Sequence, residues 1–68
     1  MTPGEFIRVR RTVLRISQQK LGEACGYSGR SATVTVQHWE QDRSCIPTDK
    51  LRRAAEALKV PLDSPLIP

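Results

Sequence analysis

Residues 17–40 constrain the fold of this 68-residue chain more than any other segment. Ser17 is a favourable helix N-cap, and the residues after it predict a short helix that ends at Gly26. The inner face of this helix should hold Leu21, Ala24 and Cys25. After a turn that contains a second glycine, apolar residues recur at the i, i+4 and i+7 spacing of one buried helix face, at Ala32, Val36 and Trp39. The segment therefore predicts two successive helices separated by a glycine break.

The run of β-branched residues at 33–36 would by itself favour a strand. We predict a helix because the alternation typical of a strand stops at Gln37, whereas the helical period continues to Trp39. For the same reason we place the Trp39 side chain in the core rather than on the surface. The opposite side of this helix, with Thr33 at its edge, then carries polar residues and one valine, namely Arg30, Ser31, Val34, Gln37, His38 and Gln41.

Helices are also predicted on both sides of this segment. The start TPGE combines an N-cap, a first-turn proline and a capping box, and predicts a helix from Pro3 to about Arg15. A last helix should begin near Thr48, with an inner face made of Leu51, Ala54, Ala55 and Leu58. The chain has one residue each of Phe, Trp and Tyr, so its core must come from aliphatic and small side chains. We therefore expect a single all-α domain over residues 1–68, a compact bundle of four to five short helices.

The net charge of +4 lies in the first half of the chain. Residues 1–34 hold six basic and two acidic side chains, whereas residues 35–68 hold five of each. This asymmetry fits a face that binds a polyanion, and it fits a solvated basic surface equally well. Charge alone therefore permits nucleic-acid binding without indicating it.

The sequence argues against several other classes of protein. One small domain leaves little room for an enzyme cleft, and no nucleophile, base and orienting residue are grouped, so we expect no enzymatic activity. Cys25, Cys45 and His38 come from separate segments without metal-ligand spacing, so we expect no metal and no cofactor, and no small-molecule ligand is evident. No apolar run could span a membrane and the N-terminus lacks a signal-peptide core, so the expected location is the cytoplasm.

The combination of these motifs resembles the helix-turn-helix domains of the phage repressor and Cro family, the lambda repressor-like domains. The shared pattern, IRxxR…SQxxLGxxxG…VxxWE…P…LxxxAxAL, covers residues 3 to about 62. The resemblance implies a helix-turn-helix at about residues 17–41, whose second helix enters the DNA major groove. It also implies structural roles, with a close helix crossing at Gly22, anchoring of the second helix by Val36 and Trp39, and an ion pair between Arg11 and Glu40.

The same resemblance suggests which residues contact DNA. Base contacts are expected from Thr33, Val34, Gln37 and His38, of which Gln37 lies nearest the DNA backbone. Phosphate contacts are expected from Gln18, Arg30, Ser31 and Arg43. The exposed valine suits a thymine methyl group, and His38 can donate a hydrogen bond to guanine N7 or O6.

The chain departs from the family between Gly26 and Val36, where it is longer by about four residues, the length of one helical turn. Either the second helix is extended at its N-terminus, or the turn has become a glycine loop. An extended helix would bring Arg30 to the groove, whereas a loop would make Arg30 a phosphate clamp. Both alternatives remain open from the sequence.

The expected function is that of a sequence-specific regulator of transcription that binds double-stranded DNA. We expect a Cro-like repressor that binds a near-palindromic operator as a homodimer. Its dimer contact is predicted around the tail, residues 60–68, and is made of Leu58, Val60, Leu62, Leu66 and Ile67. The alternative is an antitoxin-like or other protein-interaction subunit, whose apolar tail covers a partner such as a toxin while the helix-turn-helix controls its own operon. A further alternative is nucleic-acid binding without sequence preference.

Overall fold

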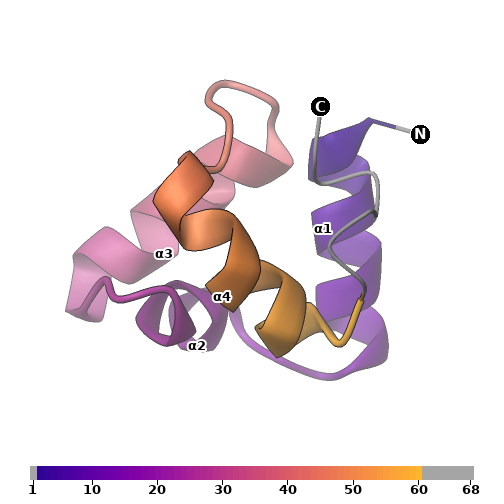
Figure 1. The fold of residues 1–68 in the computed structure, drawn as a ribbon, viewed down its shortest axis with the longest axis horizontal. Helices are drawn as coiled ribbons and strands as arrows, with labels where there is room; N and C mark the ends of the chain where they lie inside the picture. Colours follow the sequence, from indigo (N-terminus) through magenta and orange to yellow (C-terminus); the bar gives the residue numbers. More distant parts are fainter. Residues whose placement is uncertain (1, 61–68) are drawn as a thin grey trace.

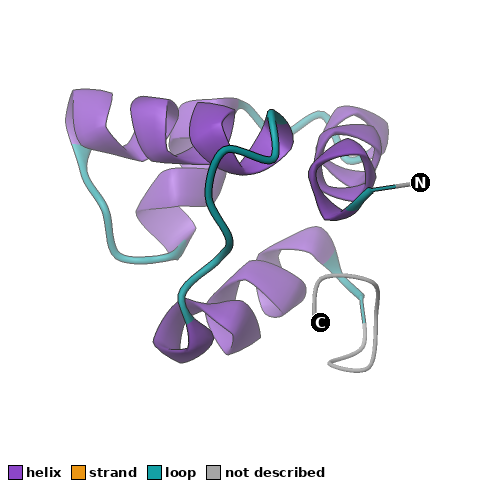
Figure 2. Cartoon of the chain, turned by 90° about the horizontal axis from the view of Figure 1, so that it is seen from above, coloured by secondary structure: helices purple, strands orange, loops and turns teal. Residues whose placement is uncertain are grey.

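The structure, a computed structural model, describes residues 2–60. This part of the chain folds into four α-helices joined by short loops (Figure 1). They are α1 (Pro3–Val13), α2 (Gln18–Ala24), α3 (Gly29–Glu40) and α4 (Thr48–Leu58). No strand occurs between residues 2 and 60 (Figure 2). The predicted all-α bundle is confirmed, and a fifth helix would fall on residues 61–68, outside the described range.

The helices enclose one hydrophobic core. α3 packs on α2 and α1, and α4 packs on α1 and α2. In the view of Figure 1, α4 lies between α3 and α1, nearer to the viewer than α2 and α3. The core is formed by apolar side chains from all four helices and the end of α2, namely Ile7, Leu21, Cys25, Val36, Trp39, Ala54 and Leu58. Val36 and Trp39 therefore anchor α3 from its buried side, as predicted.

Two predictions about burial are wrong. Ala24, expected on the inner face of α2, is exposed, whereas Leu21 and Cys25 on the same helix face are fully buried. Leu58 was expected both on the inner face of the last helix and at a dimer contact. Its side chain has no exposed surface and lies in the core of its own chain, which confirms the first expectation and contradicts the second. Val60 is half-buried after α4. The remaining predicted dimer residues, Leu62, Leu66 and Ile67, lie outside the described residues.

Side-chain caps fix the starts of the first two helices. The hydroxyl groups of Thr2 and Ser17 accept hydrogen bonds of 3.2 and 3.0 Å from the backbone N–H groups three residues later, as their N-cap positions predict. α1 ends at Val13 rather than near Arg15, because Arg15 adopts a left-handed backbone conformation with φ of 57°. The chain turns there and enters α2.

The first turn of α3 settles the question left open by the sequence. α3 begins at Gly29, so the extra residues lengthen the helix and do not form a loop. Gly29 has φ of 55°, a conformation that glycine adopts without steric penalty. Ser28 occupies the N-cap position, but its side chain makes no capping hydrogen bond. Arg30 and Ser31 therefore project from the first turn of a regular helix.

Glycine permits two close helix crossings. A Cβ atom at Gly22 would lie 2.5 Å from the carbonyl oxygen of Ala32 and 2.6 Å from its Cα, far inside normal contact. This confirms the predicted close approach of α2 and α3. A Cβ atom at Gly4 would lie 2.6 Å from the carbonyl oxygens of Trp39 and Glu40, so α1 meets the end of α3 equally closely. That second crossing was not anticipated from the sequence.

The two cysteines are expected to react very differently. Cys25 has no exposed surface, and burial raises the pKa of its thiol, an effect that the nearby charges of Lys50 and Arg53 partly offset. Cys45 is exposed and unpaired. Because the thiolate is the reactive form, the folded protein at neutral pH should be alkylated rapidly at Cys45 alone. Mass spectrometry should find one modified thiol in the native state and two in denaturant.

The control for this experiment is Cys45→Ser, which should leave the native protein unmodified. Equal rates of modification at both thiols in the native state would contradict the buried position of Cys25.

Candidate nucleic-acid interface

The outward face of α3 is an open depression with polar ends and an apolar centre. It is lined by Arg30, Ser31, Val34, Thr35 and His38. Val34 keeps 37% of its surface exposed, although its neighbours Ala32 and Val36 are completely buried. Large apolar side chains with this much exposure are few among the described residues, and the others, Val9 and Val13, lie on α1. Val34 is thus the apolar group that α3 presents to the outside.

The structure brings together four of the eight residues predicted to contact DNA. Arg30, Ser31, Val34 and His38 all line this depression. The sequence missed Thr35, which lies one turn after Ser31 and three residues before His38. Residues four apart lie on the same face of a helix, so the spacing between Ser31 and Thr35 could have identified Thr35 as part of this surface.

Two of the predicted base contacts lie elsewhere on the helix. Thr33 and Gln37 are half-buried and do not line the depression. Gln37 instead points toward α2, where its Nε2 donates a hydrogen bond of 3.3 Å to Oε1 of Gln18. A base contact from either residue stays a prediction.

A polar network behind α3 ties three helices together. Nε of Arg11 donates to Oε2 of Glu40 at 2.6 Å, and Nη2 of Arg11 donates to Oε1 of Glu40 at 3.4 Å. Nη1 of Arg11 also donates to the carbonyl oxygen of Ile16 at 3.0 Å. The side chains of Arg11 and Glu40 are only 18% and 7% exposed. The predicted ion pair is therefore present, and it links α1 to the end of α3.

Gln18 extends this network to α2. Its Nε2 donates to Oε1 of Glu40 at 3.2 Å, while its Oε1 accepts the hydrogen bond from Gln37. The side chain of Gln18 is therefore a link between α2 and two positions of α3, a role that the sequence did not suggest. The amide of Gln18 has a second N–H, so its contact with a phosphate stays a prediction.

Positive charge lies near both ends of α3. Arg30 in the first turn and Arg43 beyond the last turn are exposed. The backbone N–H of Arg43 donates to the carbonyl oxygen of His38 at 2.9 Å, which keeps Arg43 close to the end of the helix. Within residues 2–60, no carboxylate lines the depression. This distribution of charge favours an anionic partner.

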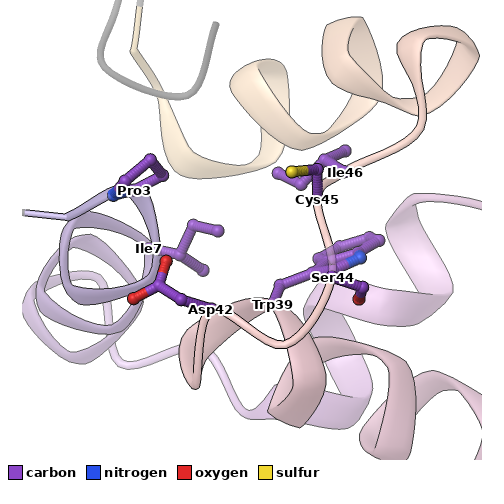
Figure 3. A pocket seen from close by; sticks show the side chains of 7 residues that line it. All are labelled: Pro3, Ile7, Trp39, Asp42, Ser44, Cys45 and Ile46. Carbon is purple, nitrogen blue, oxygen red and sulfur yellow. The ribbon is translucent and has the colours of Figure 1, made fainter. Parts of the chain in front are cut away.

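A second hollow lies away from the outward face of α3, between α1 and the end of α3. It has a volume of about 120 Å³ and is bounded by the start of α1, the end of α3 and the following loop (Figure 3). Ile7, Trp39 and Ile46 contribute much of its lining, with Cys45 at its side. The carboxylate of Asp42 also lines it and accepts a hydrogen bond of 3.0 Å from the backbone N–H of Gly4. A small, largely apolar hollow with a carboxylate is unsuited to a polyanion.

Two features are absent from the described residues. No group of three or more His, Cys, Asp or Glu side chains in residues 2–60 is placed to hold a metal ion. No helix in the same range is long and apolar enough to cross a membrane.

The fold and the outward face of α3 define a helix-turn-helix protein. A short helix, a tight glycine-containing turn and a second helix with a buried stripe and a polar outer face are the features of this class. The chain belongs to the helix-turn-helix family, whose model matches residues 7–64. It is of the phage repressor and Cro type.

Two relatives carry the name of uncharacterized HTH-type transcriptional regulator, one from Sinorhizobium medicae (strain WSM419) and one from Rhizobium meliloti (strain 1021). Each is 34% identical to this chain over 59 residues, which is 87% of this chain and 40% of the relative. The chain therefore spans about two fifths of the length of these relatives. The family is one of transcription regulators rather than enzymes.

A solved structure is also similar. It is the crystal structure of the P22 c2 repressor protein in complex with synthetic operator 9T in the presence of Tl⁺. The TM-score is 0.81 at 32% sequence identity, and the match covers 93% of this chain and 89% of that chain.

Proposed function

We propose that this chain is a sequence-specific regulator of transcription that binds double-stranded DNA by inserting α3 into the major groove. The observation that carries the proposal is the outward face of α3, where an exposed Val34 lies between Arg30 and His38 in a depression without carboxylates. The major groove admits one helix and displays donors, acceptors and methyl groups that distinguish the base pairs. The similar P22 c2 repressor structure contains operator DNA, which supports the same partner here.

Each group on this face matches a chemical feature of the groove. Arg30 can donate two hydrogen bonds to guanine O6 and N7, or bind a phosphate. His38 can donate to guanine N7 or O6. Val34 cannot form hydrogen bonds and suits an apolar group. Arg43, exposed beyond the helix, is proposed to bind backbone phosphate, which adds affinity without sequence preference.

The network of Arg11, Gln18, Gln37 and Glu40 holds α3 at a fixed angle to α1 and α2. Base recognition requires donors to be placed within hydrogen-bond distance of the base edges, so the supporting groups must keep the helix in register. We assign these four residues the role of positioning the outward face of α3.

We further propose a Cro-like repressor that acts as a homodimer on a near-palindromic operator. One helix contacts only a few base pairs, and two helices related by a twofold axis double the length of DNA that is read. The proposed dimer contact consists of the half-buried Val60 and the following tail, with Leu62, Leu66 and Ile67. Leu58 is not part of this contact, because its side chain is buried in the core.

Selection from random duplex DNA tests this function. The wild-type chain should enrich a near-palindromic sequence with two half-sites about one DNA turn apart, and affinity should fall as salt rises. Val34→Ala should weaken binding by about fourfold per half-site, as expected for the loss of one buried methyl group. His38→Ala should weaken it by about 2- to 13-fold, as expected for the loss of one hydrogen bond, and both changes should alter the preferred bases. Binding constants can be measured by fluorescence anisotropy at two salt concentrations.

Two control variants complete this experiment. Val13→Ala removes an exposed valine from α1 and should leave binding unchanged. Arg43→Ala should weaken binding to all sequences alike and lower the salt dependence by about one unit of slope for each subunit bound. If no sequence is enriched, the proposed function is wrong, and enrichment of a lone half-site would contradict the homodimer.

A further inference from the structure

We infer that Lys50 and Arg53 of α4, together with the glycine turn between α2 and α3, form a binding site for the phosphate monoester group of a small molecule. This site is separate from the outward face of α3. It would therefore give the protein a second anionic ligand, in addition to the DNA of the proposed function.

Two basic side chains of α4 converge on Gly26, which lies just after α2. A Cβ atom at Gly26 would lie 3.1 Å from Nη1 of Arg53 and 3.3 Å from Nζ of Lys50. Lys50 and Arg53 are three residues apart, so they project from the same face of α4. Because glycine has no side chain, both cationic groups come close to the same point, and one small anion can contact both.

The two cations receive little compensation from carboxylates. Among residues 2–60, Arg53 forms no ion pair, and that of Lys50 spans 4.0 Å to an Asp49 side chain that is 76% exposed. An ion pair as exposed as this contributes little. Burial raises the pKa of the neighbouring Cys25 thiol, and the charges of Lys50 and Arg53 oppose this rise, so the two cations favour negative charge at the end of α2. A bound anion would be attracted by both charges and would relieve their mutual repulsion.

Tyr27 holds the ammonium group in place. Nζ of Lys50 lies 5.4 Å from the centroid of the Tyr27 ring, which is a cation–π contact. The Tyr27 ring in turn meets Trp39 edge-on, with the two ring centroids 6.0 Å apart. Trp39 belongs to the buried stripe of α3, so Lys50 lies on that side of the helix. Neither Lys50 nor Arg53 lines the depression on the outward face, and the two cations are therefore not part of the surface that is proposed to enter the groove.

The charge of the site selects a phosphate monoester over a phosphodiester. A monoester carries about −1.5 to −2 charges at pH 7 and presents three strong acceptor oxygens, whereas each phosphate of the DNA backbone carries one negative charge. Two adjacent cations match the charge of the monoester. The planar guanidinium of Arg53 can donate two parallel hydrogen bonds to its oxygens, and the ammonium of Lys50 can donate a third.

The test compares methyl phosphate, a monoester, with dimethyl phosphate, a diester, at pH 7 and at an ionic strength matched with sodium chloride. Methyl phosphate should shift the backbone amide NMR signals of Gly26 and Tyr27 in a saturable way and raise the melting temperature, because a ligand that binds only the folded state stabilises it. Dimethyl phosphate should bind about tenfold more weakly, or less, as expected for the loss of one charge-assisted hydrogen bond.

Matched variants of α4 identify the residues that are responsible. Lys50→Gln and Arg53→Gln should each weaken the binding of methyl phosphate by about tenfold or more. Arg52→Gln is the control, because it removes the same charge from an exposed position two residues after Lys50, on another side of the helix, and should leave this binding unchanged. Binding to the selected operator should fall no further in Lys50→Gln and Arg53→Gln than in Arg52→Gln.

Three results would overturn the phosphate site. The first is the absence of saturable binding of methyl phosphate, and the second is an equal loss of binding in Arg52→Gln. The third is a loss of operator binding in Lys50→Gln and Arg53→Gln as large as that in Arg43→Ala, which would assign the two cations to the DNA backbone instead. Each of these results would leave the enrichment of an operator, and with it the proposed function, intact.

Discussion

Glu40→Ala is expected to lower the free energy of unfolding by about 3–5 kcal/mol, because it removes one partner of a largely buried ion pair. The carboxylate of Glu40 accepts two hydrogen bonds from Arg11 and one from Gln18. Without it, Arg11, whose side chain is 18% exposed in the intact protein, would have no counter-charge in this network. Such a loss is a large part of the stability of a small domain. Urea unfolding followed by the fluorescence of Trp39, which packs in the core, would measure the change.

Two comparisons make the result specific to the buried pair. The Asp49–Lys50 ion pair spans 4.0 Å with an Asp49 side chain that is 76% exposed, so Asp49→Ala should change stability by no more than ~0.5 kcal/mol. The double variant Arg11→Met/Glu40→Leu removes both charges and should recover most of the stability lost in Glu40→Ala. A Glu40→Ala protein as stable as the wild type would show that the pair contributes no net stability.

The main helices and their buried faces could be predicted because one apolar residue per turn identifies the side that leaves water. Ala32, Val36 and Trp39 meet this condition, and all three are buried. Gly22 was informative for a related reason, since glycine inside a helix is unfavourable unless a missing side chain is needed. The resemblance to a family supplied the ion pair of Arg11 and Glu40, which spacing alone does not indicate.

Other features could not be predicted because the period of a helix does not reveal what its faces contact. The helical period placed Leu58 on the inner face of α4, but it did not show that this side chain is completely buried and so unavailable to a second copy. Ala24 was misplaced because a methyl group gains little from burial and tolerates water. The link between Gln18 and Gln37 depends on how α2 and α3 cross, which is a tertiary property. The start of α3 at Gly29 was undecided, since glycine suits a loop and a helix end alike.

Gly22→Ala is expected to lower the free energy of unfolding by about 2–3 kcal/mol, in the range found for overpacked cores. The added Cβ atom would meet the carbonyl oxygen, Cα and Cβ of Ala32 at 2.5–2.6 Å. Two of these three atoms belong to the backbone, so relief requires α2 and α3 to move apart. Alanine also gains about 1 kcal/mol over glycine from helix propensity, and the measured loss is what remains after this gain.

The consequence of this change should extend beyond stability to DNA binding. If α3 moves away from α2, the hydrogen bond between Gln37 and Gln18 lengthens, and Val34 and His38 shift relative to the groove. Thermal unfolding and binding to the selected operator should therefore both worsen in Gly22→Ala. Ala24→Gly, at an exposed position of the same helix, serves as the control, because it changes helix propensity without touching α3 and should leave affinity for DNA unaltered. A Gly22→Ala protein with undiminished stability would mean that α2 and α3 are not held in contact at Ala32. The close crossing of these helices would then not explain how the outward face of α3 is held in place.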